Sequence, residues 1–138
     1  MIVVLDSNAA IEIVLKRDRG MAFRDIIESA EKTVSSEFFR IEVANVIRKY
    51  YQGEYIRKAD CNKIMELAEN LVDEFVPIKE NYLEALNEAI RLKFPAYDML
   101  YLTLARRKSA LLLTLDHSLN MIAKKEGIEI TKQEKKAR

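Results

Sequence analysis

The chain has little cysteine, histidine or glycine. Its single cysteine, Cys61, excludes a disulfide within the chain and fits a reducing compartment. One cysteine and one histidine among 138 residues cannot supply the nitrogen- and sulfur-rich ligand set typical of zinc. The three glycines, Gly20, Gly53 and Gly127, do not form the glycine-rich loops of dinucleotide or P-loop nucleotide sites.

Long apolar runs and an excess of one charge are also absent. No apolar stretch approaches the roughly 20 residues of a membrane-spanning helix. The N-terminal apolar run is too short for a signal peptide and is not preceded by basic residues. We therefore expect a cytoplasmic protein without a membrane partner. The formal net charge of +1 gives no overall basic field, so any contact with nucleic acid must come from a local patch.

Length and hydrophobic content favour a single globular domain. With 49% hydrophobic and 33% charged residues, the 138-residue chain suits one sizeable core. We predict one domain over residues 1–131 and a charged flexible tail over residues 132–138.

Short apolar runs alternate along the chain with segments of helical periodicity. The predicted strands are 2–6, 33–35, 75–78, 110–115 and 128–130. The predicted helices are 8–16, 21–30, 36–51, 56–72, 81–92, 96–108 and 117–126. Strands separated by helices imply a three-layer α/β/α fold with a central, mostly parallel sheet of four or five strands. Right-handed crossovers and a central first strand favour the strand order 3-2-1-4-5.

Single residues mark some of the expected boundaries. Ser36 is predicted to be the N-cap of the helix 36–51. Pro77 cannot donate a ladder hydrogen bond, which favours an edge position for the strand 75–78. Gly127 is expected to stop the helix that begins at about residue 117.

Acidic residues follow two of the most apolar predicted strands. Asp6 ends the run Ile2-Val3-Val4-Leu5, and Asp116 ends the run 111–115. In the predicted strand order these strands are neighbours, and the crevice outside their carboxyl ends is where open α/β sheets bind ligands. Two carboxylates facing each other there favour a hard divalent cation.

Two further acids lie on helical faces that carry apolar side chains. Asp98 shares its face with Leu102 and Ala105, and Glu42 lies on a face with Phe38. A bare carboxylate is costly to bury, so each needs a cation, a basic partner or a proton.

Each acid also has a purely local interpretation. Asp6 fits an Asx turn into the first helix, Asp98 a favourable interaction with a helix dipole, and Asp116 an N-cap. Glu42 fits a surface acid paired with a basic residue of its helix. These interpretations explain the acids one by one but do not predict that all four meet.

Four short motifs occur in order along the chain. They are Asp6-Ser7-Asn8 after the first strand, Glu42 with Asn45 in a helix, Tyr97-Asp98 opening a helix, and Thr114-Leu115-Asp116 after a late strand. Their order and spacing resemble the PIN domain family, and within it the VapC-type toxin ribonucleases. The resemblance covers essentially the whole chain.

The resemblance implies an acidic catalytic and metal-binding set. Its members are Asp6, Glu42, Asp98 and Asp116. The residues expected to support them by hydrogen bonds are Ser7, Asn8, Asn45 and Thr114. Many PIN domains have a further acid shortly after the fourth, whereas the residues here are His117-Ser118-Leu119-Asn120. The number of metal ions therefore stays open, and Asn120 is a candidate to bind an ion through a water molecule.

Oxygen ligands suit Mg²⁺ or Mn²⁺, which bind a scissile phosphate and activate water. The resemblance implies an endoribonuclease that leaves 5′-phosphate and 3′-hydroxyl ends and acts as the toxin of a type II toxin–antitoxin pair. It also implies a homodimer and a small cognate antitoxin. For the RNA substrate, Arg40 is the candidate phosphate contact and Tyr97 the candidate base-stacking residue.

Other functions fit parts of the pattern. A PIN nuclease of RNA maturation or decay needs the same acids without a toxin role. A binding module of the PIN fold needs none of them. A phosphatase with Asp6 as nucleophile is disfavoured, because Asn8 occupies the position of the second aspartate that such enzymes require.

Overall fold

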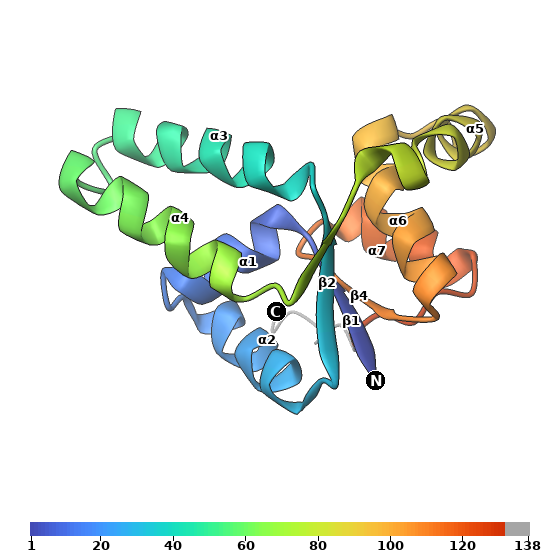
Figure 1. The fold of residues 1–138 in the computed structure, drawn as a ribbon, viewed down its shortest axis with the longest axis horizontal. Coiled ribbons are helices and arrows are strands. Elements are labelled where there is room, and N and C mark those ends of the chain that lie inside the picture. The colour runs from blue at the N-terminus through green and yellow to red at the C-terminus, as the bar shows by residue number, and fades with distance from the viewer. Residues whose placement is uncertain (132–138) are drawn as a thin grey trace, which may run out of the picture.

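The computed structural model describes residues 1–131 as a parallel sheet between two layers of helices (Figure 1). The strands are β1 (Ile2–Leu5), β2 (Lys32–Ser36), β3 (Glu74–Val76) and β4 (Leu111–Leu113). Their order is β3-β2-β1-β4, with all three pairings parallel. The predicted three-layer fold and the order 3-2-1-4 are confirmed.

Helices cover both faces of this sheet. They are α1 (Ser7–Val14), α2 (Asp18–Ser29), α3 (Phe39–Gln52), α4 (Cys61–Asn70), α5 (Tyr82–Leu92), α6 (Ala96–Lys108) and α7 (His117–Lys125). Short 3₁₀ turns occupy Lys58–Asp60 and Ile78–Glu80. In Figure 1, α1 to α4 lie on one side of the sheet and α5 to α7 on the other, with α3 and α4 extending outward side by side.

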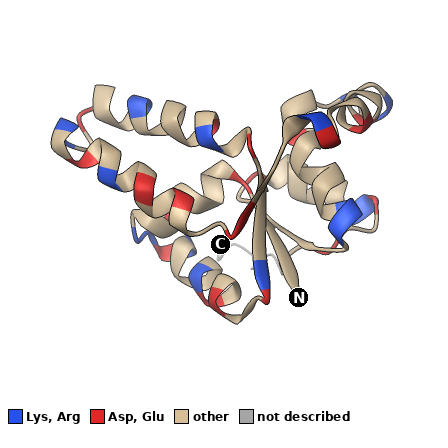
Figure 2. Cartoon of the chain, in the orientation of Figure 1, with Lys and Arg blue, Asp and Glu red and all other residues tan. Residues whose placement is uncertain are grey.

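Basic and acidic residues are distributed over both helical layers (Figure 2). Lysine and arginine do not gather into one extended field, as the net charge of +1 implies. None of the helices in the described part of the chain is both long and apolar enough to cross a membrane.

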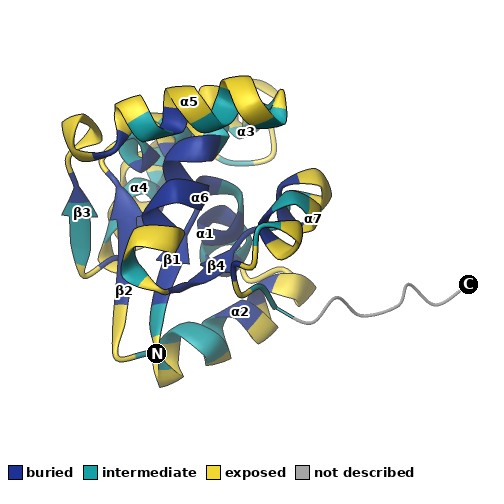
Figure 3. Ribbon diagram, turned by 90° about the vertical axis from the view of Figure 1, so that its right-hand side faces the viewer, coloured by how far each residue is buried: buried dark blue, intermediate teal, exposed yellow. Residues whose placement is uncertain are grey.

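The core lies where β1, β4 and α6 meet (Figure 3). Val3 to Leu5 and Leu111 to Leu113 are buried. Every residue from Met99 to Ala105 is also buried, so α6 is apolar on all sides and acts as a core helix. Burial of β1 and β4 explains why both strands are continuous apolar runs in the sequence.

The predicted fifth strand, 128–130, forms only a single parallel bridge, between Leu112 and Ile130. The Ile128 N–H donates to the carbonyl of Ala123 at the end of α7, at 2.9 Å. Pairing with β4 therefore begins only at Glu129, whose carbonyl accepts from Leu112 at 2.9 Å.

The predicted N-cap at Ser36 is wrong. Ser36 pairs with Val76 as the last residue of β2, and α3 begins at Phe39. The Ser36 hydroxyl instead accepts from the Phe38 N–H at 3.1 Å and stabilises the turn between strand and helix.

Other boundaries differ by a few residues. The helix expected over 56–72 is α4, which begins at Cys61 after the 3₁₀ turn. β3 ends at Val76, immediately before Pro77, and lies at the predicted edge of the sheet. Gly127 ends α7 with φ +78°, as expected. The predicted tail, residues 132–138, lies outside the described residues.

Candidate active site

The carboxyl ends of β1 and β4 bring Asp6 and Asp116 to the same edge of the sheet. The Asp6 N–H donates to the Leu113 carbonyl at 3.2 Å, so the two strand ends lie side by side. Asp6 Oδ1 caps α1 by accepting from the Ala9 N–H at 3.1 Å. Asp116 Oδ1 caps α7 by accepting from the Leu119 N–H at 3.0 Å. Capping thus engages one oxygen of each carboxylate.

The other two acids reach this edge from helices. Asp98 lies in the first turn of α6, and Glu42 lies in the first turn of α3. Both are half-buried. Glu42 accepts hydrogen bonds from the hydroxyls of Tyr101 and Ser7. Carboxylates from the ends of two strands and the starts of two helices therefore face a common space.

Their charges act on one another. Burial raises the pKa of Asp6 to about 7, against the hydrogen bonds from Thr114 and Ala9, and the charges of Glu42 and Asp98 raise it further. Burial also raises the pKa of Asp98 to about 6, with added repulsion from Asp116 and Glu42. Burial raises the pKa of Glu42 as well, although the Tyr101 and Ser7 hydroxyls oppose it.

No basic side chain neutralises this cluster. Among residues 1–131, none of the twelve ion pairs includes Asp6, Glu42, Asp98 or Asp116. The local interpretation of Glu42 as a surface acid with a basic partner is therefore wrong. The capping roles of Asp6 and Asp116 are confirmed.

The donor set suits a hard cation. Its ligands are carboxylate and hydroxyl oxygens, which Mg²⁺ and Mn²⁺ prefer. Within residues 1–131, no group of three or more histidine, cysteine, aspartate or glutamate side chains is arranged so that it could hold a metal ion.

Polar residues around β4 fix the two strand-end acids. The Thr114 hydroxyl contacts the Asp6 carboxylate and accepts from the Asp116 N–H at 3.1 Å. Asn8 Oδ1 accepts from the Leu115 N–H at 2.9 Å, which ties α1 to the chain after β4. Asn8 and Thr114 thus connect the start of α1 with the segment after β4, and the supporting roles of Ser7, Asn8 and Thr114 stay predictions.

Asn120 adds a polar side chain to this support. It lies one turn after Asp116, is 2% exposed, and donates through Nδ2 to the Thr114 carbonyl at 3.0 Å. Its Oδ1 is buried and has no hydrogen-bond partner within residues 1–131. Such an acceptor is suited to a bound water beside the acids.

Two predicted residues are engaged elsewhere. Asn45 is exposed, and its Oδ1 accepts from Arg48 Nε at 3.1 Å. Arg40 forms ion pairs with Glu37, at 2.7 Å, and with Glu69. The Arg40 guanidinium also lies 4.0 Å from the centre of the Phe75 ring. Neither side chain contacts the four acids.

Tyr97 remains accessible beside Asp98. Its side chain is 52% exposed, and its ring centre lies 6.2 Å from that of Phe38. The two rings come from the starts of α6 and α3, the helices that carry Asp98 and Glu42. The two rings form an aromatic surface beside Asp98.

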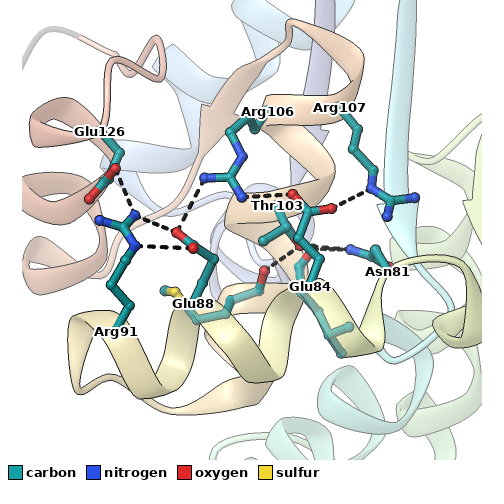
Figure 4. A network of polar contacts seen from close by, with 10 residues as sticks. Asn81, Glu84, Glu88, Arg91, Thr103, Arg106, Arg107 and Glu126 are labelled. Atoms are coloured by element: carbon teal, nitrogen blue, oxygen red, sulfur yellow. Dashed lines mark hydrogen bonds and ion pairs between the residues drawn. The ribbon is translucent and has the colours of Figure 1, made fainter.

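The basic C-terminal turn of α6 does not belong to this site. Arg106 and Arg107 pair with Glu84 of α5 at 2.7 and 2.6 Å, and Arg106 also contacts Glu88 at 3.2 Å. Arg91 joins the network through Glu88 and Glu126 (Figure 4). Arg106 and Arg107 thus tie α6 to α5, and Arg91 ties α5 to Glu126 at the end of α7.

Sequence reasoning missed Tyr101, which donates to Glu42. An apolar-looking tyrosine inside a core helix resembles a packing residue. The available signal was its spacing of three from Asp98, which puts both side chains on one helical face.

Comparisons with known proteins agree with this geometry. The PIN domain profile matches residues 3–125. No curated protein matches the sequence.

Solved structures share the fold at low sequence identity. PAE2754 from Pyrobaculum aerophilum is 19% identical, with a TM-score of 0.72, and the match covers 94% of this chain and 92% of that one. A chain of VapBC2 from Rickettsia felis, bound to a DNA fragment from the promoter, is 14% identical with a TM-score of 0.68 and coverages of 95% and 98%. A chain of VapBC-1 from nontypeable Haemophilus influenzae is 19% identical, with a TM-score of 0.64 and coverages of 95% and 97%. By its sequence match over residues 3–125, the chain belongs to the PIN domain family.

Proposed function

We propose that this PIN domain is a divalent-metal-dependent endoribonuclease and the toxin of a type II toxin–antitoxin pair. The observation that carries the proposal is the cluster of Asp6, Glu42, Asp98 and Asp116. Repulsion from the other acids adds to the effect of burial in raising the pKa of Asp6 and of Asp98, and none of the four has a basic ion-pair partner among residues 1–131. A buried cluster of like charge is tolerable when a cation binds it.

The proposed chemistry is hydrolysis of an RNA phosphodiester. When bound, Mg²⁺ or Mn²⁺ supplies the positive charge that attracts the phosphate and lowers the pKa of an attacking water. Asp6, Asp98 and Asp116 would hold the ion directly or through water, and Glu42 would complete the set or orient the water. The expected products carry 5′-phosphate and 3′-hydroxyl ends.

Substrate contacts follow from the surroundings of Asp98. The exposed Tyr97 ring, next to Phe38, offers a stacking surface for an unpaired base. Arg40 would have to exchange Glu37 or Glu69 for a phosphate oxygen, so we expect it to contribute less than Tyr97. Asn45 would act only if it left Arg48.

We further propose a small antitoxin and a second copy of this chain as partners. Two of the similar structures are of VapBC proteins, which supports the antitoxin. A cavity of about 620 Å³ lies where the end of α3 approaches the start of α4, and apolar side chains contribute much of its lining. They are Leu15, Tyr51, Tyr55, Ile56 and Ile64. We expect part of the antitoxin to occupy this cavity.

A strip of exposed apolar residues on α5 supports the homodimer. Its members are Tyr82, Leu83, Leu86 and Ile90. Their spacing puts them along one side of the helix, where a second α5 would bury them in an isologous contact.

The decisive experiment is an RNA cleavage assay with Mg²⁺, with Mn²⁺ and with a chelator. We expect cleavage with either metal and none with the chelator. Asp98→Asn should reduce cleavage by at least a hundredfold, because it removes a ligand charge while keeping the side-chain shape. Asp25→Asn, on the exposed face of α2, is the matched control and should cleave like the parent. Equal activity of parent and Asp98→Asn would contradict the proposal.

The same assay separates the other candidates. A binding module of the PIN fold would retain RNA without cutting it under any metal condition. A nuclease of RNA maturation would cut RNA but would not arrest growth when expressed without a partner protein.

A further inference from the structure

Glu42 differs from the other acids of the site in how it is held. Asp6 and Asp116 are fixed by capping bonds at strand ends, whereas Glu42 lies on α3, which packs mainly on α1 and α4. In Figure 1, α3 and α4 extend away from the sheet on the side opposite α6. Contacts across the site must therefore keep Glu42 turned toward the other acids.

The Tyr101 hydroxyl makes such a contact. Tyr101 is 1% exposed within the core helix α6, and its hydroxyl donates to Glu42 Oε1. Among the described residues, the Ser7 hydroxyl at the start of α1 is the other group that favours the ionised form of Glu42 by lowering its pKa. The Glu42 carboxylate is thus fixed from two elements other than its own.

We propose that Tyr101 is a positioning residue that holds Glu42 toward Asp6 and Asp98 and thereby sets the affinity of the site for a divalent cation. This inference rests on the proposed metal-dependent function. Tyr101 acts through Glu42 and does not touch the substrate.

A purely structural role explains the phenol less well. Phenylalanine would fill the same volume of the core without a polar group that must be desolvated. Hydrogen bonds from Tyr101 and Ser7 favour the ionised form of Glu42 and oppose the effect of burial on its pKa. A carboxylate kept ionised and fixed in direction is the form that binds a cation.

The test is a double-mutant cycle on Mn²⁺ affinity, measured by calorimetry with the full chain. Its variants are Tyr101→Phe, Glu42→Gln and the combination of both. We expect Tyr101→Phe to weaken Mn²⁺ binding roughly fivefold in the parent. In the Glu42→Gln background the same change should alter the affinity less than about twofold, because the group through which Tyr101 acts is already neutral.

A second readout needs no metal. In metal-free protein, the carboxyl carbon of Glu42 is titrated by NMR, and Tyr101→Phe should raise its pKa because the donor is lost. Tyr50→Phe, at a half-buried tyrosine near the end of α3, is the matched control and should change neither readout.

The outcomes separate this inference from the proposed function. The positioning role alone would be overturned if Tyr101→Phe left Mn²⁺ affinity unchanged. It would also be overturned if Tyr101→Phe weakened Mn²⁺ binding equally with Glu42 and with Gln at position 42. A parent protein that binds no Mn²⁺ would overturn the metal-dependent function and, with it, the role assigned to Tyr101.

Discussion

Asp6 affects the stability of the folded protein in two opposite ways. Its Oδ1 caps α1, which stabilises the fold. Its burial near Glu42 and Asp98 raises its pKa to about 7, which shows that the ionised form is costly in the folded protein. The protein therefore keeps a destabilising charge at the place where a cation would bind.

We predict that Asp6→Asn abolishes cleavage and stabilises the metal-free protein at pH 8. Asparagine keeps the capping oxygen but carries no charge. The pKa of Asp6 in the folded protein lies above its ordinary value of 3.8, so folded Asp6 binds more protons than unfolded Asp6 between about pH 4 and 7. Parent stability thus falls as the pH rises through this window. The gain of the variant should be about 1–3 kcal/mol at pH 8 and small at pH 4.

Urea unfolding in chelator at both pH values measures this difference. Asp25→Asn should show no comparable gain. A variant less stable than the parent at pH 8 would mean that the Asp6 carboxylate is stabilising without an ion.

Metal binding should show the complementary pH dependence. Protonated Asp6 and Asp98, with pKa values of about 7 and 6, cannot bind a cation well. We expect Mn²⁺ to raise the melting temperature of the parent at pH 8 and to raise it much less at pH 5. A thermal-shift series with Mn²⁺ from pH 5 to 8 measures this, and a shift that does not depend on pH would contradict it.

The position of a site residue could be predicted where the local sequence pattern itself placed the residue at the site. Asp6 and Asp116 follow apolar strands, so their positions followed from the sheet alone. Tyr101 was not predictable, because its partner Glu42 lies on a distant element. The roles of Arg40 and Asn45 stay predictions, and the sequence pattern did not indicate that Glu69 and Arg48 engage them.

At the scale of elements, the contact between α5 and α6 supports the helix that carries Asp98. Asn81, at the start of α5, is 3% exposed. Its Nδ2 donates to the Leu100 carbonyl at 3.0 Å and to Thr103 Oγ1 at 2.9 Å. Figure 4 shows this contact beside the Glu84 and Glu88 ion pairs.

We predict that Asn81→Ala lowers the free energy of unfolding by about 1–3 kcal/mol, because buried hydrogen bonds are lost and a gap remains. The exposed Asn87, on the same helix, is the matched control, and Asn87→Ala should change stability by less than about 0.5 kcal/mol. Chemical denaturation of both variants measures the difference. Equal effects would show that the Asn81 contact contributes little.

Elements were predictable to the extent that their hydrophobic pattern was unambiguous. The strands β1 and β4 and the helix α6 were correctly located, because their residues are buried and form continuous apolar runs. The fifth strand was overpredicted, because the Ile128 N–H returns to α7 instead of joining the sheet. Ser36 was misassigned, because its backbone pairs with β3, a contact that local sequence does not encode.

At the scale of the whole molecule, the exposed strip on α5 and the cavity at the end of α3 offer separate surfaces. The strip consists of side chains on the outside of one helical layer, and the cavity lies in the other layer. A dimer through α5 would therefore leave the cavity accessible to another partner.

We predict that Leu86→Glu converts the proposed dimer to a monomer without unfolding it, because two carboxylates would meet near the centre of an isologous contact. Leu67→Glu, an exposed leucine on α4, is the control and should leave the dimer intact. Size-exclusion chromatography with light scattering at matched concentrations measures the mass. A monomeric parent, or a dimer unaffected by Leu86→Glu, would contradict the assignment of this surface.

The capping bonds of Asp6 and Asp116 limit how these carboxylates could bind a metal ion. Since an amide N–H already engages one oxygen of each carboxylate, both residues favour monodentate rather than chelating attachment. Mg²⁺ or Mn²⁺ held by these residues would therefore keep part of its water shell. Under the proposed function, a nucleophilic solvent molecule and a backbone oxygen of the nucleic acid would take up that remaining space.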